Sequence, residues 1–377
     1  MKKILTIFML SVLLLFFLSG CSNPKEILYV GTYDMRGSEG LYVYEFDRGN
    51  QEYALLQTLP QVSAPNFLAI APSGKYLYSV NTMEGAEGGK VDGVSAFRID
   101  RANGRLELLN QVPAYGRGAC HIETDRRGLF LYISHYGSGS LAVFGINPDG
   151  SIADSVQTIQ FEGSSITERQ KSSHLHSILV SHDNRFAYAA DLGTDRIMIF
   201  ERDRLSGRLT PALQSFAASI PGSGPRHMAF SIDGTRLYLA EELSCAVSVF
   251  SVDTVDGALT RVQTLSTLPA DFDGWNTVAD IHLAPDGKRL YVSNRGHNSL
   301  AVFSVSEDGT LVADGHVGVE GEHPRNFMVD PVGEFLLVAN RDTDNITRLL
   351  AAGGELPVYA NDDLELPAPV CLKWLRY

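Results

Sequence analysis

Gly74-Lys75-Tyr76-Leu77-Tyr78-Ser79-Val80-Asn81 is the stretch that decides the fold of this 377-residue chain, because its pattern recurs along the whole sequence. Each copy places a turn residue before a short apolar run that ends on a polar side chain, at Gly128–His135, Asn184–Asp191, Gly234–Glu241, Gly287–Asn294 and Gly333–Asn340. Successive copies begin 46 to 56 residues apart. A further copy without its turn lies at Ile27–Thr32. The chain therefore contains seven repeats of about 50 residues.

Each repeat follows one plan of four short strands. An apolar strand leads into a polar turn such as Pro285-Asp286-Gly287, which supplies hairpin chemistry, and a second strand follows. A third strand is exemplified by Ser299–Phe303, and Glu307–Leu311 opens a fourth. Repeats of this length and content are typical of propeller blades arranged around an axis. The sequence predicts an all-β, seven-bladed β-propeller with a central channel, formed as a single domain by residues 27–377.

The two ends of the chain are expected to close this ring. Ile27 opens the first copy, and the C-terminal segment Pro369–Trp374 is a further strand candidate. Pairing these segments removes the last exposed sheet edge, which would otherwise be open to aggregation.

Composition limits the classes of partner. The chain has 44 acidic and 31 basic side chains, a formal net charge of −13, with 44% hydrophobic and 20% charged residues. These proportions are typical of a globular protein with a sizeable core. The acidic balance argues against a nucleic-acid partner, which would select a basic face. We expect a monomer.

The N-terminus has the form of an export signal. Lys2 and Lys3 precede the apolar run Ile4–Leu18, which is about 15 residues long and is marginal for crossing a membrane. Leu18-Ser19-Gly20-Cys21 follows and resembles a bacterial lipoprotein signal with its lipobox. This resemblance implies cleavage of residues 1–20, lipidation of Cys21 and a short tether at 21–26. The folded body would then be an exported lipoprotein anchored by its lipid in the cell envelope, on a periplasmic or extracellular face. The alternative is an uncleaved N-terminal anchor.

Cysteine and histidine usage indicates neither a disulfide framework nor a metal centre. Cys120, Cys245 and Cys371 are widely scattered and odd in number, so we interpret them as small buried apolar residues. The histidines show no regular ligand pair backed by carboxylates. No cofactor and no metal are expected.

The hairpin plan gathers polar side chains at one mouth of the channel. In an antiparallel hairpin, the start of the first strand and the end of the second lie at the same end. The first-strand starts contribute His121, His174, His176, Arg226, His227, Asp280, His282 and Arg325. The second-strand ends contribute His135, Asp191, Glu241, Glu242, Asn294, Arg295, Asn340 and Arg341. Arginine binds carboxylate or phosphate through paired hydrogen bonds, so this mouth predicts an anionic ligand. Alternatively, the arginines pair with acidic residues between blades and hold the ring together.

Several spaced motifs resemble the lactonase family of seven-bladed propellers, which includes bacterial 6-phosphogluconolactonase of the propeller type and fungal carboxy-cis,cis-muconate cyclase. They are Gly31-Thr32-Tyr33, Asn66-Phe67-Leu68-Ala69, Tyr136-Gly137-Ser138-Gly139-Ser140, Gly222-Ser223-Gly224-Pro225-Arg226-His227, Ala279-Asp280-Ile281-His282-Leu283 and Tyr291-Val292-Ser293-Asn294-Arg295-Gly296. The similarity runs from about Leu28 to the C-terminus. It implies a 6-phosphogluconolactonase-like enzyme that hydrolyses a sugar lactone or another anionic lactone.

The muconate cyclase branch of the family also implies a set of site residues. Its histidine falls on His176, its two arginines on Arg226 and Arg295, and its glutamate on Glu242, with Glu241 one register away. Lactone hydrolysis needs an oxyanion stabilised and a proton moved to the leaving oxygen. We therefore assign Arg226 and Arg295 to anion and oxyanion binding, and His176 and Glu242 to acid–base catalysis. Further substrate contacts are expected from His174, Asp280, His282 and Arg325.

Two other functions remain open. One is a tethered propeller that binds an anionic ligand or a protein partner without turning it over, because a fold does not fix a function. The other is a lactonising enzyme like the muconate cyclase. Export also makes a cytoplasmic phosphorylated lactone an improbable substrate, which favours a different, extracellular lactone.

Overall fold

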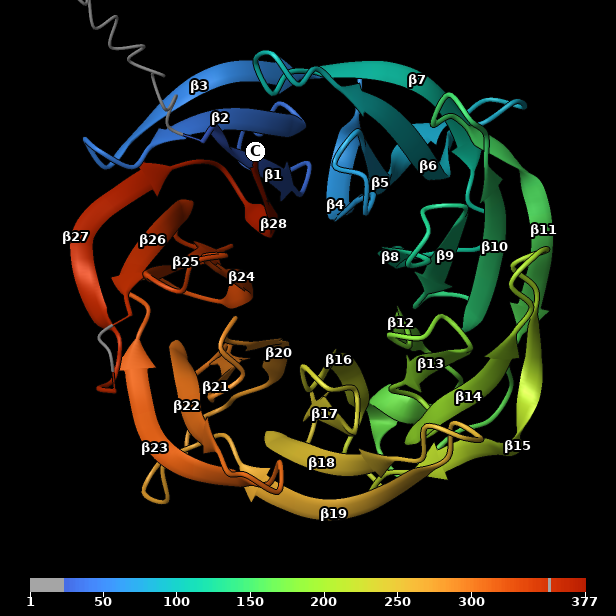
Figure 1. The fold of residues 1–377 in the computed structure, drawn as a ribbon, viewed down its shortest axis with the longest axis vertical. Helices are drawn as coiled ribbons and strands as arrows, with labels where there is room; N and C mark the ends of the chain where they lie inside the picture. Colours follow the sequence, from blue (N-terminus) through green and yellow to red (C-terminus); the bar gives the residue numbers. More distant parts are fainter. Residues whose placement is uncertain (1–23, 352–353) are drawn as a thin grey trace, which may run out of the picture.

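The computed structural model describes residues 24–351 and 354–377, so the predicted signal and Cys21 lie outside the described part of the chain. Within that part, 28 strands form seven four-stranded antiparallel sheets around a central channel (Figure 1). The prediction of a seven-bladed propeller is confirmed. The described residues contain no helix with the length and apolar character needed to cross a membrane.

The sheets are numbered here as blades 1 to 7 along the chain. Blade 1 consists of β28 (Pro369–Arg376), β1 (Glu26–Thr32), β2 (Leu41–Asp47) and β3 (Glu52–Leu59). Blade 2 consists of β4 (Ser63–Ile70), β5 (Tyr76–Glu84), β6 (Lys90–Ile99) and β7 (Leu106–Pro113). Blade 3 consists of β8 (Ala119–Thr124), β9 (Phe130–His135), β10 (Ser140–Ile146) and β11 (Ile152–Gln160). Blade 4 consists of β12 (Leu175–Val180), β13 (Phe186–Asp191), β14 (Arg196–Arg202) and β15 (Leu209–Ala218).

The last three blades repeat this order. Blade 5 consists of β16 (Pro225–Phe230), β17 (Arg236–Glu241), β18 (Ala246–Val252) and β19 (Leu259–Ser266). Blade 6 consists of β20 (Val278–Leu283), β21 (Arg289–Asn294), β22 (Ser299–Val305) and β23 (Leu311–Gly318). Blade 7 consists of β24 (Pro324–Val329), β25 (Phe335–Asn340), β26 (Asn345–Leu350) and β27 (Val358–Glu365). A short 3₁₀ helix, η1 (Glu168–Gln170), lies between blades 3 and 4.

The ring closes where the sequence predicts it. β28 supplies the innermost strand of blade 1 and pairs antiparallel with β1, from Glu26 opposite Arg376 to Gly31 opposite Cys371. The innermost strands β4, β8, β12, β16, β20, β24 and β28 are neighbours around the channel (Figure 1). Residues from both ends of the chain therefore belong to one sheet, and no blade is left incomplete.

The tyrosine of the recurring sequence segment joins consecutive blades. The Tyr78 hydroxyl donates to the Gly150 carbonyl of the next blade at 3.0 Å, and Tyr188 does the same to Gly257 at 2.9 Å. Tyr29, Tyr132 and Tyr238 make the equivalent bonds to Gly104, Gly207 and Gly309. A buried phenol needs such a partner, since an unpaired hydroxyl would be costly. The sequence repeat is thus also a repeat of contacts between blades.

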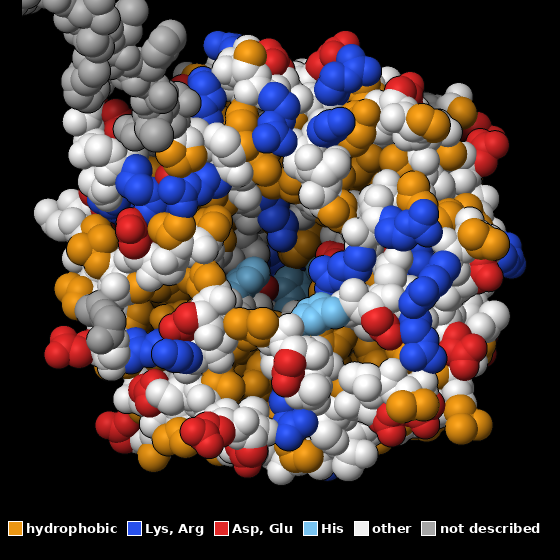
Figure 2. Space-filling model, in the orientation of Figure 1, with side chains coloured by type: hydrophobic (Ala, Val, Ile, Leu, Met, Phe, Trp, Pro, Cys, Tyr) orange, Lys and Arg blue, Asp and Glu red, His pale blue; other side chains and the backbone are white. Residues whose placement is uncertain are grey.

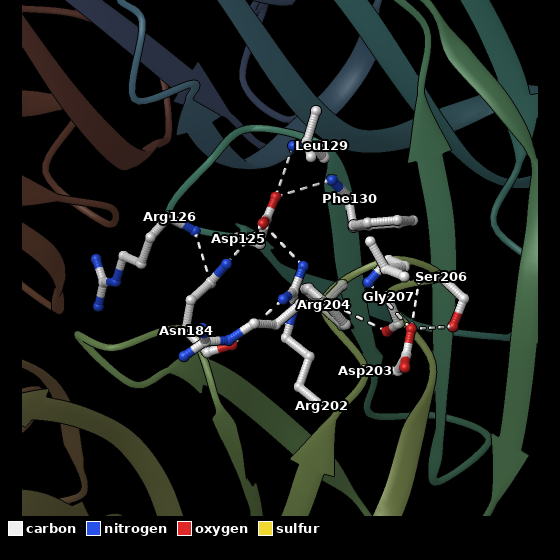
Figure 3. Close-up of polar contacts among 12 residues, drawn as sticks. Asp125, Arg126, Leu129, Phe130, Asn184, Arg202, Asp203, Arg204, Ser206 and Gly207 are labelled. Atoms are coloured by element: carbon white, nitrogen blue, oxygen red, sulfur yellow. Dashed lines mark hydrogen bonds and ion pairs between the residues drawn. The ribbon is translucent and has the colours of Figure 1, made fainter.

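A buried ion pair adds to the contact between blades 3 and 4 (Figure 3). The Arg202 Nη2 atom lies 2.8 Å from Asp125 Oδ2, and neither side chain is exposed to solvent. Asp125 also accepts bonds from the backbone of Leu129 and Phe130 and from the Asn184 amide (Figure 3). Because burying a charge is unfavourable unless it is paired and hydrogen-bonded, this full set of partners makes the interior position tenable.

Candidate active site

A pocket of about 320 Å³ opens at the end of the channel where the innermost strands begin. We call it the first pocket. It is lined by Tyr33, Asn66, Asp92, Gly118, Ala119, Cys120, Tyr136, Arg169, His176, Glu242, Arg295 and Arg325. These residues come from all blades but few of them are neighbours in sequence, so ring closure is what assembles the pocket.

Irregular pairing marks this end of the innermost strands. The register between the first two strands of a blade shifts between Leu175 and Ser177, between Pro225 and Met228 and between Val278 and Ile281. The inner strands of blades 2, 3 and 7 have a shift at the same end. A bulge bends a strand and re-aims its side chains, and bulges are frequent beside functional sites. The start of each inner strand is therefore shaped to present side chains at the mouth.

Glu242 is the centre of the charged network in the first pocket. Its Oε2 atom lies 3.0 Å from both Arg226 Nε and Arg295 Nη2, and its Oε1 atom lies 2.7 Å from Arg169 Nη1. Burial alone would raise the pKa of Glu242, but the charges of Arg295, Arg226 and Arg169 lower it to about 2. Glu242 is therefore ionised at neutral pH. This arrangement favours a positioning role for Glu242 over the proton donation expected from the sequence.

Glu241, the alternative register, belongs to the interior of blade 5. It accepts hydrogen bonds from Ser219 and from Ser248, the latter at 3.0 Å. The structure thus places Glu242, and not Glu241, in the first pocket.

Arg226 lies behind Glu242 and not on the pocket surface. Its side chain is 2% exposed, and Nη1 donates to the backbone carbonyl of Ala279 in blade 6. Burial and the like charges of Arg295 and Arg325 lower the pKa of Arg226, while Glu242 raises it. This placement favours a supporting role for Arg226 over the anion-binding role inferred from sequence.

His176 lines the first pocket as a neutral imidazole. Burial lowers its pKa well below the usual value, and the charges of Arg226, His227 and Arg325 lower it further. Its Nε2 atom is 3.9 Å from Glu242 Oε2, and Nδ1 is buried with no hydrogen-bond partner among the described residues. A neutral imidazole can accept a proton, and the ionised carboxylate near Nε2 would stabilise the imidazolium that forms.

Arg325 supplies an uncommitted positive charge. Its guanidinium lies 5.3 Å from the centroid of the Tyr33 ring. Within the described part of the chain, its side chain has no ion pair or hydrogen bond. Arg295, in contrast, donates to the Val278 carbonyl at 2.8 Å as well as pairing with Glu242. The first pocket therefore holds one arginine that is free to bind an anion beside others that are already engaged.

The other predicted contacts lie elsewhere. His174 stacks on Tyr136 with ring centroids 4.4 Å apart, and its Nδ1 atom is 2.7 Å from the Tyr136 carbonyl, so it supports the pocket wall. Asp280 and His282 line a different cavity, which also contains His227. The hairpin plan predicted that all of these residues lie at one mouth of the channel. Successive residues of an inner strand lie at different depths along the channel, so they reach different cavities.

Arg169 is a pocket residue that sequence reasoning missed. It belongs to η1, in a segment that has no counterpart in the other repeats, and its Nη2 atom donates to the Tyr136 hydroxyl at 3.0 Å. The sequence did contain a signal for this residue, because its segment departs from the repeat pattern. An insertion between two blades at the mouth end can reach the channel.

Cys120 also differs from its interpretation as a plain buried residue, since it lines the first pocket. Burial raises its pKa to about 12, so the thiol stays protonated. No disulfide is present among Cys120, Cys245 and Cys371. Within the described residues, no group of three or more His, Cys, Asp or Glu side chains could hold a metal ion.

The fold and pocket define a class: a seven-bladed propeller whose channel carries an arginine-rich pocket around a single ionised glutamate. Residues 27–374 match the family model described as "Lactonase, 7-bladed beta-propeller". The chain belongs to this family.

Individual relatives cover nearly the whole propeller. A 6-phosphogluconolactonase of Formosa agariphila is 37% identical over 85% of this chain and 90% of its own length. The 6-phosphogluconolactonase of Bacillus subtilis is 33% identical over 93% of this chain and 99% of its own length. Among solved structures, the periplasmic gluconolactonase of Pseudomonas aeruginosa is 33% identical, with a TM-score of 0.87, covering 93% of this chain and 99% of that one.

Proposed function

We propose that the protein is a lactone hydrolase that opens a sugar lactone to its acid in the first pocket. The observation that carries this proposal is the convergence of neutral His176, uncommitted Arg325 and the Arg295–Glu242 pair on one cavity. Three arginines line this cavity against the carboxylates of Glu242 and Asp92, and Arg226 lies behind it. The excess of positive charge suits a substrate that carries or develops negative charge.

The reaction follows from these positions. His176 accepts a proton from water as the water oxygen bonds to the lactone carbonyl carbon. The carbonyl oxygen becomes an oxyanion, which Arg295 stabilises. The bond from that carbon to the ring oxygen then breaks, and the ring oxygen takes the proton back from His176. The acid that forms ionises at neutral pH and releases one proton to the solvent.

Glu242 and Arg226 act by positioning. Ionised Glu242 holds Arg295 and Arg169 at fixed distances and stabilises the imidazolium that His176 forms during the reaction. Arg226 fixes Glu242 from behind and ties it to the backbone of the next blade. Such a preorganised charge arrangement needs little rearrangement when the oxyanion appears.

Arg325 is proposed to bind the part of the substrate that is remote from the reacting carbonyl. It would pair with a phosphate or carboxylate, or donate to sugar hydroxyls. The relatives are named for phosphorylated and for unphosphorylated gluconolactone. Glucono-lactone is our preferred substrate, because the export that we also propose would expose the protein to unphosphorylated sugars.

The test is proton release from glucono-δ-lactone, its 6-phosphate and a muconolactone, measured with the wild type and with His176→Asn. We expect rapid turnover of one sugar lactone by the wild type, and a loss of about 10²-fold or more in kcat/KM for the variant. No turnover of any of these lactones by the folded wild type would favour the alternative of a binding propeller. Turnover unchanged in folded His176→Asn would remove His176 from the mechanism.

We also propose that the protein is exported and held at the membrane by lipid on Cys21. The support is the lipobox-like sequence before Cys21. Labelling of cells with a radioactive fatty acid should mark the wild type and leave Cys21→Ser unmarked. Equal labelling of both proteins would contradict the proposal.

A further inference from the structure

The channel contains a second cavity, of about 250 Å³, at the end opposite the first pocket. It reaches the hairpin turns that follow β8 and β12, where Arg126 and His182 lie, whereas the first pocket reaches the starts of these strands. The rings of Phe67, His121, His176 and His227 separate the two cavities, with centroids 4.4 to 5.6 Å apart. The face drawn in Figure 2 is hollowed at the channel, and histidine and basic side chains gather at this hollow.

His227 lines the second cavity and carries a buried ring nitrogen that has no hydrogen-bond partner among the described residues. Its side chain is 7% exposed, and its Nδ1 atom lies 2.7 Å from Asp280 Oδ1. The pKa of Asp280 is well below its usual range, so this carboxylate only accepts, and Nδ1 must carry the proton. Burial lowers the pKa of His227 to about 4, so its other ring nitrogen, Nε2, bears a lone pair at neutral pH. That atom is buried and has no partner among the described residues.

The remaining partners of Asp280 fix this arrangement. Its Oδ2 atom accepts bonds from the Asn326 amide and from His282 Nε2, the latter at 3.0 Å. Asp280 is therefore fully engaged and orients His227. Asp280 was expected to touch substrate, whereas its position supports the ring of His227, which lines the second cavity.

Two cationic side chains line the same cavity without a carboxylate partner. Lys373 lies over the Phe67 ring, with Nζ 5.0 Å from the centroid, and Arg126 donates to the Val180 carbonyl at 2.7 Å. Neither has an ion pair within the described ranges. Glu123 is the other acidic residue of the lining, and burial raises its pKa while the nearby charges of Arg126 and Lys373 lower it. The lining thus places two cations that form no ion pair among the described residues near a ring nitrogen without a hydrogen-bond partner.

From this combination we infer that the second cavity binds a small hydroxycarboxylate, separately from the reaction in the first pocket. Lys373 and Arg126 bind its carboxylate, and one of its hydroxyl groups donates to His227 Nε2. The open-chain acid produced under the proposed function belongs to this chemical class, and gluconate is therefore the probe. The choice of gluconate as the probe rests on the proposed function. The inference of a binding site in the second cavity does not rest on it.

The test follows imidazole resonances of histidine-labelled protein by NMR during titration with gluconate. We expect shifts of the His227 and His282 signals in the wild type, and the same shifts in Arg325→Met, in which the first pocket has lost its free arginine. Lys373→Met keeps the side-chain stem over Phe67 and removes the charge, so it should weaken gluconate binding about tenfold or more.

A second variant tests the hydroxyl contact. His227→Asn can still donate an amide proton to Asp280 but lacks Nε2, so it should weaken gluconate binding, followed at His282, and leave propionate binding unchanged. Thermal unfolding establishes that each variant is folded. Shifts confined to His176, or lost in Arg325→Met, would overturn the second site. Equal affinity of the wild type for propionate and gluconate would overturn the hydroxyl contact.

Discussion

At the residue scale, Glu242 determines both the stability and the charge of the first pocket. Glu242→Gln preserves shape but leaves Arg226 and Arg295, which are 2% and 8% exposed, without their counter-charge. We expect the free energy of unfolding to fall by about 3–5 kcal/mol and kcat/KM to fall by about 10²-fold or more. Denaturant titration and initial rates measure the two effects.

Arg325→Met is the matched control for this change. Because Arg325 has no charged partner among the described residues, its loss should alter the unfolding free energy by no more than about 0.5 kcal/mol. It should raise KM, since the residue is proposed to bind substrate. A Glu242→Gln protein as stable as the wild type would show that the network contributes nothing to folding.

The pH dependence of kcat/KM tests the protonation states of the same two residues. In the proposed mechanism, Glu242 is ionised, with its pKa near 2, and His176 is neutral, with its pKa well below the usual value. As pH falls, His176 gains a proton and can no longer act as the base. We therefore expect kcat/KM for an uncharged lactone to be constant from about pH 6 to 8 and to fall only at more acidic pH. An inflection near the ordinary histidine pKa would mean that a different, solvated histidine is the base.

At the element scale, the blades are joined by buried polar contacts at the turns, of which Asp125 and Arg202 form the most enclosed (Figure 3). Arg202→Met should lower the free energy of unfolding by about 3–5 kcal/mol, since Asp125 would remain buried and charged without its partner. The activity of the folded fraction should be unchanged, because Arg202 lies outside both cavities.

The exposed pair Arg98–Glu107 provides the comparison, with side chains 48% and 68% exposed. Arg98→Met should cost no more than about 1 kcal/mol, as is usual for solvated ion pairs. Chemical denaturation of both variants measures the two losses in the free energy of unfolding. Similar losses for the two would show that burial of the Asp125–Arg202 pair is not what matters.

At the scale of the whole molecule, stability depends on pairing the two chain ends. Deleting Pro369–Tyr377 removes β28, exposes the edge of β1 and leaves blade 1 with three strands. It also removes Trp374 from its contacts with the rings of Phe46 and Phe335. We expect the truncated chain to aggregate or to lack a cooperative unfolding transition, because an open ring presents a long unpaired edge. A monomeric, cooperatively unfolding truncated protein would contradict this role of β28.

The sequence by itself determined the number of blades, the order of strands and the pairing of Ile27 with the C-terminal segment. These features follow from local patterns of hairpin turns and apolar runs that recur along the chain. It also placed His176, Glu242 and Arg295 at one mouth, because antiparallel pairing fixes which strand ends lie together.

Only the tertiary structure decided which of these side chains share a cavity. Depth along the channel separates Asp280 and His282, the third and fifth residues of β20, from Arg325, the second residue of β24. Arg226 is hidden behind Glu242, and Arg169 reaches the pocket from a segment outside the repeats. Pairwise distances and burial set the protonation states of Glu242 and His176. These distances and degrees of burial depend on residues far apart in sequence, so they cannot be predicted from the local sequence pattern.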